Sequence, residues 1–176
     1  MNNNLIIDQG KLLATIISVV QSIELELKEL NGTGIFFVPE LYLAFQIGKT
    51  FFTNQKSIFG TEELKWVREK NLGNGGPSDL IFETPNETVV FEFKISSTWN
   101  SYAADIRKLQ RLETRDSMEF HKYFVALIDT FRGKEDPRLS NLKQELGVEP
   151  IASVTIPVNY SRYKSEMDCL LALFKI

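Results

Sequence analysis

Residues 75–96 read GGPSDLIFETPNETVVFEFKIS and contain two acidic residues and a lysine whose types and spacing could bind a divalent metal ion. The Pro-Asn pair at residues 85–86 is typical of a tight turn between two β-prone runs. A two-residue loop there predicts a hairpin in which Asp79 lies opposite Glu92. Side chains alternate along a strand, so Glu92 and Lys94 share one face of it. The pattern therefore predicts two carboxylates and a lysine on one patch of a sheet.

Such a patch has the chemistry of a magnesium site. Mg²⁺ keeps several waters and is usually bound by one or two carboxylates plus substrate phosphate. A metal held there can activate water and stabilise charge on a phosphodiester. Lys94 could orient or deprotonate that water, or neutralise the charge that develops. The alternative is a solvated, charge-paired strand face, which is a common origin of a Glu-x-Lys pattern.

Asp79, followed on the next strand by Glu92, Phe93 and Lys94 and then by a helix, resembles the PD-(D/E)XK nuclease superfamily, which includes many restriction endonucleases. The resemblance covers roughly residues 35–160 and rests on these few positions. It implies that Asp79 and Glu92 hold Mg²⁺, with Mn²⁺ as a substitute and the Phe93 backbone carbonyl as a further ligand. It also implies that Lys94 assists the attack of water.

The chain departs from the family pattern at one position, because Ser78 separates Pro77 from Asp79. The proline is variable in that family. Many members also carry a glutamate on the helix before the hairpin, which contacts the metal through water. Glu40 is the candidate here, because it follows Pro39 at the expected start of a helix. An acidic residue at a helix start also suits the helix dipole, so a solvent-facing structural role for Glu40 stays open.

The segment after Lys94 is expected to form a helix capped by Thr98 or Asn100 and running to about Arg115. Its apolar face consists of Tyr102, Ile106, Leu109 and either Leu112 or Glu113. In the nucleases that the chain resembles, this helix often supplies a lysine or glutamine near the metal or the scissile phosphate. The predicted nucleic-acid contacts are Lys108, Gln110, Arg111 and Arg115. The alternative is a solvated basic face.

The remaining pattern predicts a mixed α/β protein, and the resemblance implies a restriction-endonuclease-like mixed β-sheet flanked by helices. We expect a single domain, residues 1–176, in which N-terminal helices (residues 1–55) pack on a nuclease-like core of about residues 60–160. Residues 62–69 could form either a first strand or a short helix. The glycine-rich residues 71–76 are expected to turn into the Asp79 strand.

Periodicity predicts the other elements. The first helix presents Ile16, Val20, Ile23, Leu27 and Leu30 on one face and ends at Asn31-Gly32. The second helix, residues 39–53, offers the core Leu41, Ala44, Phe45 and Ile47. A buried strand over residues 120–131, a helix over 136–146 and a strand over 151–158 follow. Ser161 is expected to cap a terminal helix.

Composition bounds the class of protein. The 176 residues are 43% hydrophobic and 24% charged, which is typical of a globular domain. The formal net charge of −3 gives no general basic signature, so nucleic-acid contacts must come from local basic faces. The only histidine, His121, is expected at an exposed strand end, which argues against a histidine-based zinc site. The only cysteine, Cys169, is expected in the core of the last helix and excludes an intrachain disulfide.

No segment approaches the length of a membrane span, and the apolar run at residues 12–20 lacks the basic leader and cleavage site of a signal peptide. We therefore expect a cytoplasmic protein. Together with the predicted metal site, the resemblance implies Mg²⁺-dependent hydrolysis of DNA by an endonuclease, with the restriction type as one option and a homodimer or a partner subunit as its assembly. The alternative is a catalytically inactive nuclease-fold protein that acts as a nucleic-acid- or protein-binding module.

Overall fold

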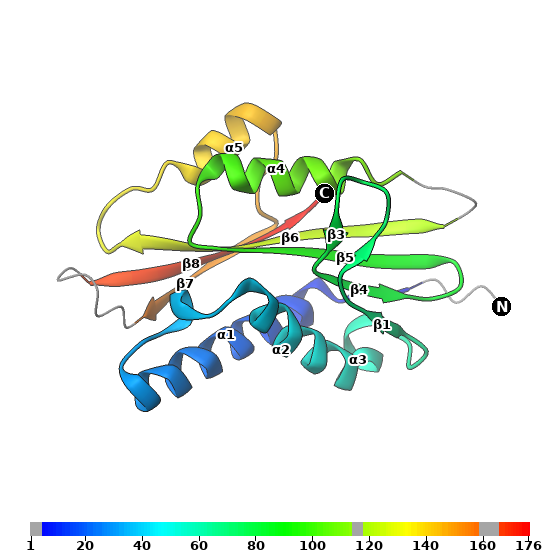
Figure 1. Ribbon diagram of the computed structural model, residues 1–176, viewed down its shortest axis with the longest axis horizontal. Coiled ribbons are helices and arrows are strands. Elements are labelled where there is room, and N and C mark those ends of the chain that lie inside the picture. Colours follow the sequence, from blue (N-terminus) through cyan, green and yellow to red (C-terminus); the bar gives the residue numbers. More distant parts are fainter. Residues whose placement is uncertain (1–4, 114–117, 159–165) are drawn as a thin grey trace.

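The computed structural model describes residues 5–113, 118–158 and 166–176 and is built around a six-stranded mixed sheet in the order β1-β4-β5-β6-β8-β7 (Figure 1). Its strands are β1 (Lys65–Val67), β4 (Leu80–Glu83), β5 (Glu87–Ile95), β6 (Glu119–Phe131), β7 (Ala152–Val158) and β8 (Met167–Lys175). β5 and β6 pair in parallel, and the other neighbouring pairs are antiparallel. A separate two-stranded ladder joins β2 (Lys70–Asn71) to β3 (Pro77–Ser78).

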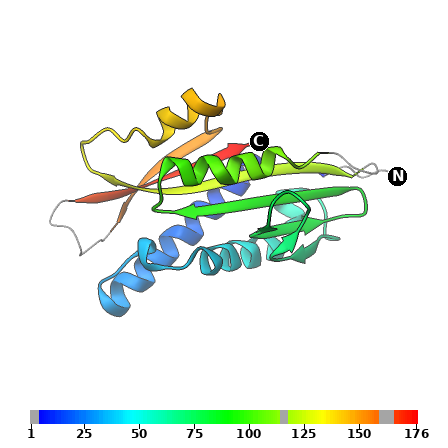
Figure 2. The same cartoon turned by 45° about the horizontal axis from the view of Figure 1, so that its top comes forward.

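Helices cover both faces of the sheet, as expected. One face carries α1 (Gln9–Asn31), the 3-10 helix η1 (Ile35–Phe37), α2 (Glu40–Thr53) and α3 (Gln55–Phe59). The other face carries α4 (Trp99–Gln110) and α5 (Arg138–Leu146), and the two layers are seen from different sides in Figure 1 and Figure 2. Within the described ranges, no helix is both long and apolar enough to cross a bilayer.

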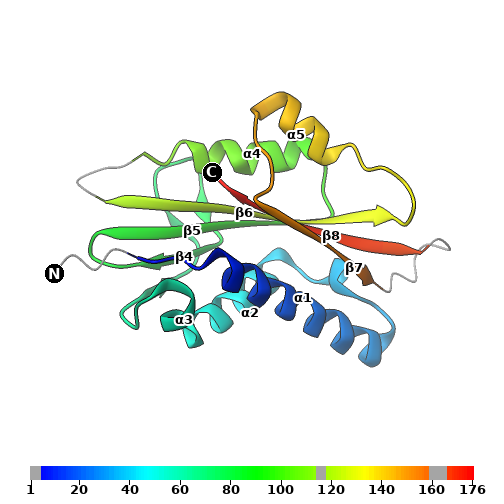
Figure 3. The same ribbon diagram turned by 180° about the vertical axis from the view of Figure 1, so that it is seen from behind.

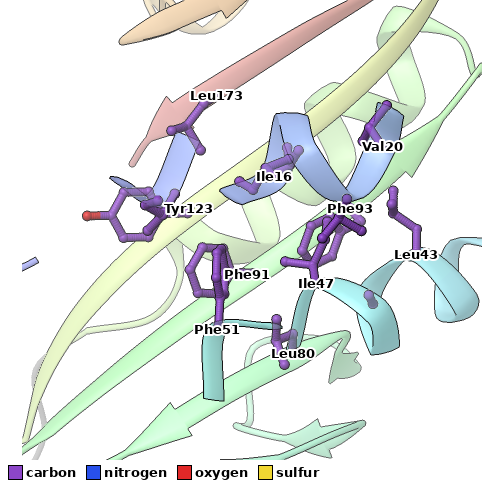
Figure 4. Close-up of a cluster of buried hydrophobic side chains, with 14 of the residues drawn as sticks. Ile16, Val20, Leu43, Ile47, Phe51, Leu80, Phe91, Phe93, Tyr123 and Leu173 are labelled. Carbon is purple, nitrogen blue, oxygen red and sulfur yellow. The ribbon is translucent and has the colours of Figure 1, made fainter. Parts of the chain in front are cut away.

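The larger core lies between the sheet and the N-terminal helices (Figure 4). β5 turns Phe91 and Phe93 to this face, because side chains alternate along a strand. Phe91 stacks on Tyr123 of β6 with ring centroids 5.2 Å apart. The helical members labelled in Figure 4 are Ile16, Val20, Leu43, Ile47 and Phe51. The same alternation leaves Glu92 and Lys94 for the opposite face of the sheet, beneath α4.

Gly48 allows α2 to pack closely on the sheet. A methyl group at this position would lie 2.7 Å from the Trp66 ring and 2.8 Å from Leu80, distances that real Cβ contacts do not reach. The missing side chain therefore fixes how near α2 comes to β1 and β4. Glu40 is the first residue of the same helix, so the close packing of α2 on the sheet also positions Glu40.

The predicted hairpin register is confirmed. Leu80 pairs with Phe91, and the Thr84 N–H donates to the Glu87 carbonyl at 2.9 Å across the turn. Continuing that register by one residue places Asp79 opposite Glu92. Residues 65–67 form the strand β1, which settles the open choice for residues 62–69 in favour of a strand.

The crossover helix α4 connects the two parallel strands. The Thr98 side chain accepts a hydrogen bond from the Ser101 N–H, so Thr98 is the cap rather than Asn100. The helix ends at Gln110 and not near Arg115, which lies outside the described residues. The Leu112 N–H bonds to the Leu109 carbonyl, and this tighter turn buries Leu112 in the core as the helix stops.

Two expectations for the N-terminal helices were wrong. Leu41 and Phe45 are 42% and 38% exposed, because α2 turns a different stripe to the sheet. Phe45 instead packs on Trp66, with ring centroids 5.6 Å apart, and lies beneath the Arg68 guanidinium. Leu30 is 74% exposed in the last turn of α1, which ends at Asn31 with Gly32 in the left-handed conformation as predicted.

The predicted terminal helix was also wrong, since residues 167–175 form the strand β8. β8 lies between β6 and β7, with β7 at the sheet edge in the view from behind (Figure 3). Cys169 and Leu171 enter one core while Ala172 and Phe174 enter the other. A strand buried on both faces has a continuous apolar run that periodicity does not separate from a buried helix. Cys169 is core, as expected, and Ser161 lies outside the described residues.

Candidate active site

Asp79 and Glu92 meet where the hairpin opens, on the face of the sheet covered by α4. The Phe93 N–H donates a hydrogen bond to Asp79 Oδ2 at 2.8 Å, which holds this carboxylate against β5. Glu92 is only 2% exposed. Lys108 Nζ lies 2.8 Å from that oxygen as an ion pair. The two predicted metal ligands are therefore adjacent, and Lys108 pairs with the buried oxygen of Glu92.

The environment of this carboxylate pair disfavours two negative charges. Burial raises the pKa of Glu92 to about 7, the charge of Asp79 adds to that rise, and Lys108 opposes it. Burial also raises the pKa of Asp79, against the opposing effects of the Phe93 N–H and Lys108. A bound divalent cation would remove this penalty, because an adjacent opposite charge favours the ionised form.

Lys94 lies between two acidic side chains. Its Nζ atom is 3.2 Å from Glu40 Oε2 and 3.1 Å from Asp105 Oδ2. Burial lowers the pKa of Lys94, but Asp105 and Glu40 outweigh burial and raise it above its usual value. Glu40 Oε1 also accepts a hydrogen bond from the Ile95 N–H at 3.2 Å. Glu40 therefore contacts Lys94 and Ile95 at the end of β5 and is not a purely solvent-facing residue.

Asp105 is the site residue that sequence reasoning missed. It projects from α4 toward Lys94, and its side chain is 20% exposed. The available signal was its spacing: Asp105 precedes Lys108 by one helical turn, so both lie on the side of α4 that faces β5. The predicted site residues of this helix were its basic residues and Gln110, and no acidic residue was among them.

Of the residues predicted to contact nucleic acid, Lys108 is drawn into the site. Its ammonium group donates to the Pro77 carbonyl and pairs with Glu92, and the Asn74 side chain donates to its backbone carbonyl at 3.0 Å. Arg111 lies beside Gly75 of the glycine-rich loop. Gln110 is exposed at the end of α4 and contributes nothing to this cluster.

The complete cluster has a formal charge that suits a divalent cation. Four carboxylates (Asp79, Glu92, Glu40 and Asp105) and two ammonium groups (Lys94 and Lys108) leave a charge of −2 when all are ionised. Two adjacent carboxylates with open positions for water and phosphate are the arrangement that Mg²⁺ prefers. The donor set therefore fits this metal.

Asp105 provides a direct test of how the cluster holds Lys94. In the Asp105→Asn variant we expect the pKa of Lys94 to fall, because one of its two acidic partners loses its charge. The free energy of unfolding should change by less than about 1 kcal/mol, since the pair is partly solvated. NMR titration of the ¹³C-methylated lysines measures this pKa. Glu62→Gln, which removes the partner of Lys56, is the matched control. An unchanged Lys94 pKa in the Asp105 variant would contradict the coupling.

A second group of ligand atoms lies elsewhere. Glu87, Glu119 and His121 have ligand atoms within 4.8 Å of one another, the one such group of three or more in the described part of the chain. His121 was expected at an exposed strand end, but its side chain is only 15% exposed and its Nε2 lies 3.0 Å from Glu87 Oε1. The neighbouring strand β5 supplies the carboxylate that covers it.

Comparisons with protein-family models, curated proteins and solved structures gave no match.

Proposed function

We propose that this protein is a Mg²⁺-dependent nuclease that hydrolyses phosphodiester bonds in DNA. The observation that carries the proposal is the placement of Asp79 against Glu92, with Lys94 two residues further along the same strand. The order of elements supports it. The hairpin of β4 and β5, the crossover α4 and the parallel strand β6 follow the strand-strand-helix-strand order expected of the PD-(D/E)XK fold.

Each residue then has a defined task. Asp79 and Glu92 would hold the metal, with the Phe93 carbonyl as a further ligand and Glu40 acting through water. The metal supplies an activated water and stabilisation of the charge on phosphate. Lys94 stays protonated between Glu40 and Asp105, so it orients the water and neutralises charge rather than removing a proton.

DNA would approach along α4 and the glycine-rich loop. Lys108, whose Nζ lies 2.8 Å from Glu92 Oε1, is the cation beside the carboxylate pair that would contact a phosphate oxygen. Arg111 lies one helical turn after Lys108 and extends this side at the end of α4, whereas Gln110, two residues from Lys108, does not share that side. Arg115 follows in sequence. Phosphate contacts of this kind give affinity without reading bases. Cutting both strands would require a homodimer or a partner subunit.

The test is cleavage of plasmid and linear DNA by the purified chain with Mg²⁺, Mn²⁺ or EDTA. We expect nicked or linear product with either metal and none with EDTA. Isothermal titration of Mg²⁺ into the native protein and into Asp79→Asn shows where the metal binds. Absence of cleavage together with absence of Asp79-dependent Mg²⁺ binding would overturn the proposal.

One observation favours a catalytically inactive binding module as the second candidate. Both lysines of the cluster are already paired with its acids, so the metal-free site is partly neutralised by the protein itself. In that case the protein would bind DNA or another protein without cutting. Salt-dependent DNA binding with neither cleavage nor Mg²⁺ uptake is the outcome that would select it.

A further inference from the structure

The group formed by Glu87, Glu119 and His121 lies at the far end of the strands that carry the candidate active site. The parallel register pairs Glu87 with Glu119 and Val89 with His121 at the starts of β5 and β6. Residues two apart on a strand share a face, so Glu119 and His121 both lie beside Glu87. Lys94 stands at the other end of β5, so this group is separate from the Asp79 and Glu92 pair.

The carboxylate of Glu87 is buried and held in one orientation. Glu87 is 5% exposed, and its Oε2 accepts a hydrogen bond of 2.6 Å from the Leu5 N–H. In Figure 3 the dark blue segment that precedes α1 runs beside the sheet. The other oxygen, Oε1, points to His121 Nε2 at 3.0 Å. At metal sites the ligating carboxylates are commonly held by hydrogen bonds of this kind, and here the second oxygen faces the other potential ligand, His121.

Among the described residues, His121 is the one cationic partner of the two glutamates in this group. Glu119 is exposed, and its side chain makes no ion pair or hydrogen bond with another residue in the described ranges. Glu87 pairs with His121 alone, and no lysine or arginine of the described residues pairs with either glutamate. Two carboxylates thus converge on one imidazole, which leaves excess negative charge at a partly buried point.

We propose that Glu87, Glu119 and His121 form a binding site for a divalent transition metal such as Zn²⁺. One imidazole nitrogen and two carboxylate oxygens are ligands that zinc accepts, with water at the fourth position. Imidazole favours zinc over magnesium, so the site differs in metal preference from the all-oxygen site at Asp79. A metal here would join the starts of β5 and β6 and, through Glu87, the segment at Leu5.

The experiment uses the single histidine as its reporter. In the chain without an affinity tag, the imidazole signals in an NMR spectrum come from His121 alone. We expect one equivalent of Zn²⁺ to shift these signals and to raise the thermal unfolding midpoint. Co²⁺ should give visible absorption typical of low coordination number. Glu92→Gln should show the same imidazole shift, because it alters only the other site.

Glu119→Gln is the decisive variant, since it removes a proposed ligand without breaking a hydrogen bond or ion pair of the described structure. We expect its Zn²⁺ affinity to fall by at least about tenfold, the lower end of the loss seen even for outer-shell partners. Glu149→Gln, which alters an exposed pair with Lys143, is the matched control. Unchanged imidazole signals in native protein would overturn the site, as would native-like affinity in Glu119→Gln. Both outcomes are independent of DNA cleavage.

Discussion

Replacing Lys94 by methionine is expected to lower the rate of Mg²⁺-dependent DNA cleavage by about 10²–10⁴-fold, the range associated with loss of one positioned catalytic group. Methionine retains the length of the side chain and removes the ammonium group that lies between Glu40 and Asp105. Single-turnover cleavage of a plasmid measures the chemical step without product release. The fold should survive, because Lys94 is 20% exposed and lies at the end of β5.

Two further variants sharpen this test. Lys94→Arg keeps the charge, so partial activity would indicate an electrostatic role and inactivity a role that needs the compact ammonium. Lys70→Met, which removes the partner of Glu83 outside the cluster, should cleave like the native protein. Circular dichroism establishes that each variant is folded. A folded Lys94→Met protein with native activity would remove Lys94 from the mechanism.

The second large effect concerns stability without metal. In Glu92→Gln we expect the metal-free protein to be more stable than the native one above neutral pH, by up to about 3 kcal/mol. The sign follows from the pKa of Glu92, which folding raises from its ordinary 4.5 to about 7. Between these values the folded state binds more protons than the unfolded state, so native stability falls as pH rises. The neutral glutamine lacks that dependence.

Urea unfolding of both proteins across pH 4–9 in EDTA measures the difference. It should be small near pH 4, grow through the window between 4.5 and about 7, and level off above it. Saturating Mg²⁺ should reverse the order at alkaline pH, because the native carboxylate gains a ligand. Glu145→Gln, at an exposed pair with Arg107, should give a flat profile. A native protein that is the more stable one at pH 8 in EDTA would contradict the environment described for Glu92.

The hairpin was predictable from sequence because its signals are local. The Pro-Asn turn fixes the register within a few residues, and alternation then assigns Glu92 and Lys94 to one face. The end of the first helix and the start of the second were also predictable from sequence. A left-handed Gly32 follows the first helix, and a proline precedes Glu40 at the start of the second. The turn and the two helix termini each depend on a few neighbouring residues, fewer than one helix or strand contains.

The rest depended on contacts between distant segments. Asp105 and Lys108 enter the site only because α4 packs across the sheet, and the helix pattern alone does not show which polar side it turns inward. β8 was read as a helix because burial on both faces removes the alternation that identifies a strand. The prediction that His121 is exposed failed because Glu87 covers it from the neighbouring strand, and the sequence does not show that this contact forms.

The spread of the site along the chain has a consequence for the time course of folding. Lys94 and Glu40 are in contact although they are 54 positions apart in the chain, and Asp105 and Lys108 join them only where α4 packs on the parallel strand pair. Contacts of such long range tend to form late in folding, because the chain loses conformational entropy on closing the loop before the contact can stabilise it. A ribosome-bound or half-folded chain therefore has no assembled cluster. For the proposed nuclease, cleavage activity would therefore report completed folding.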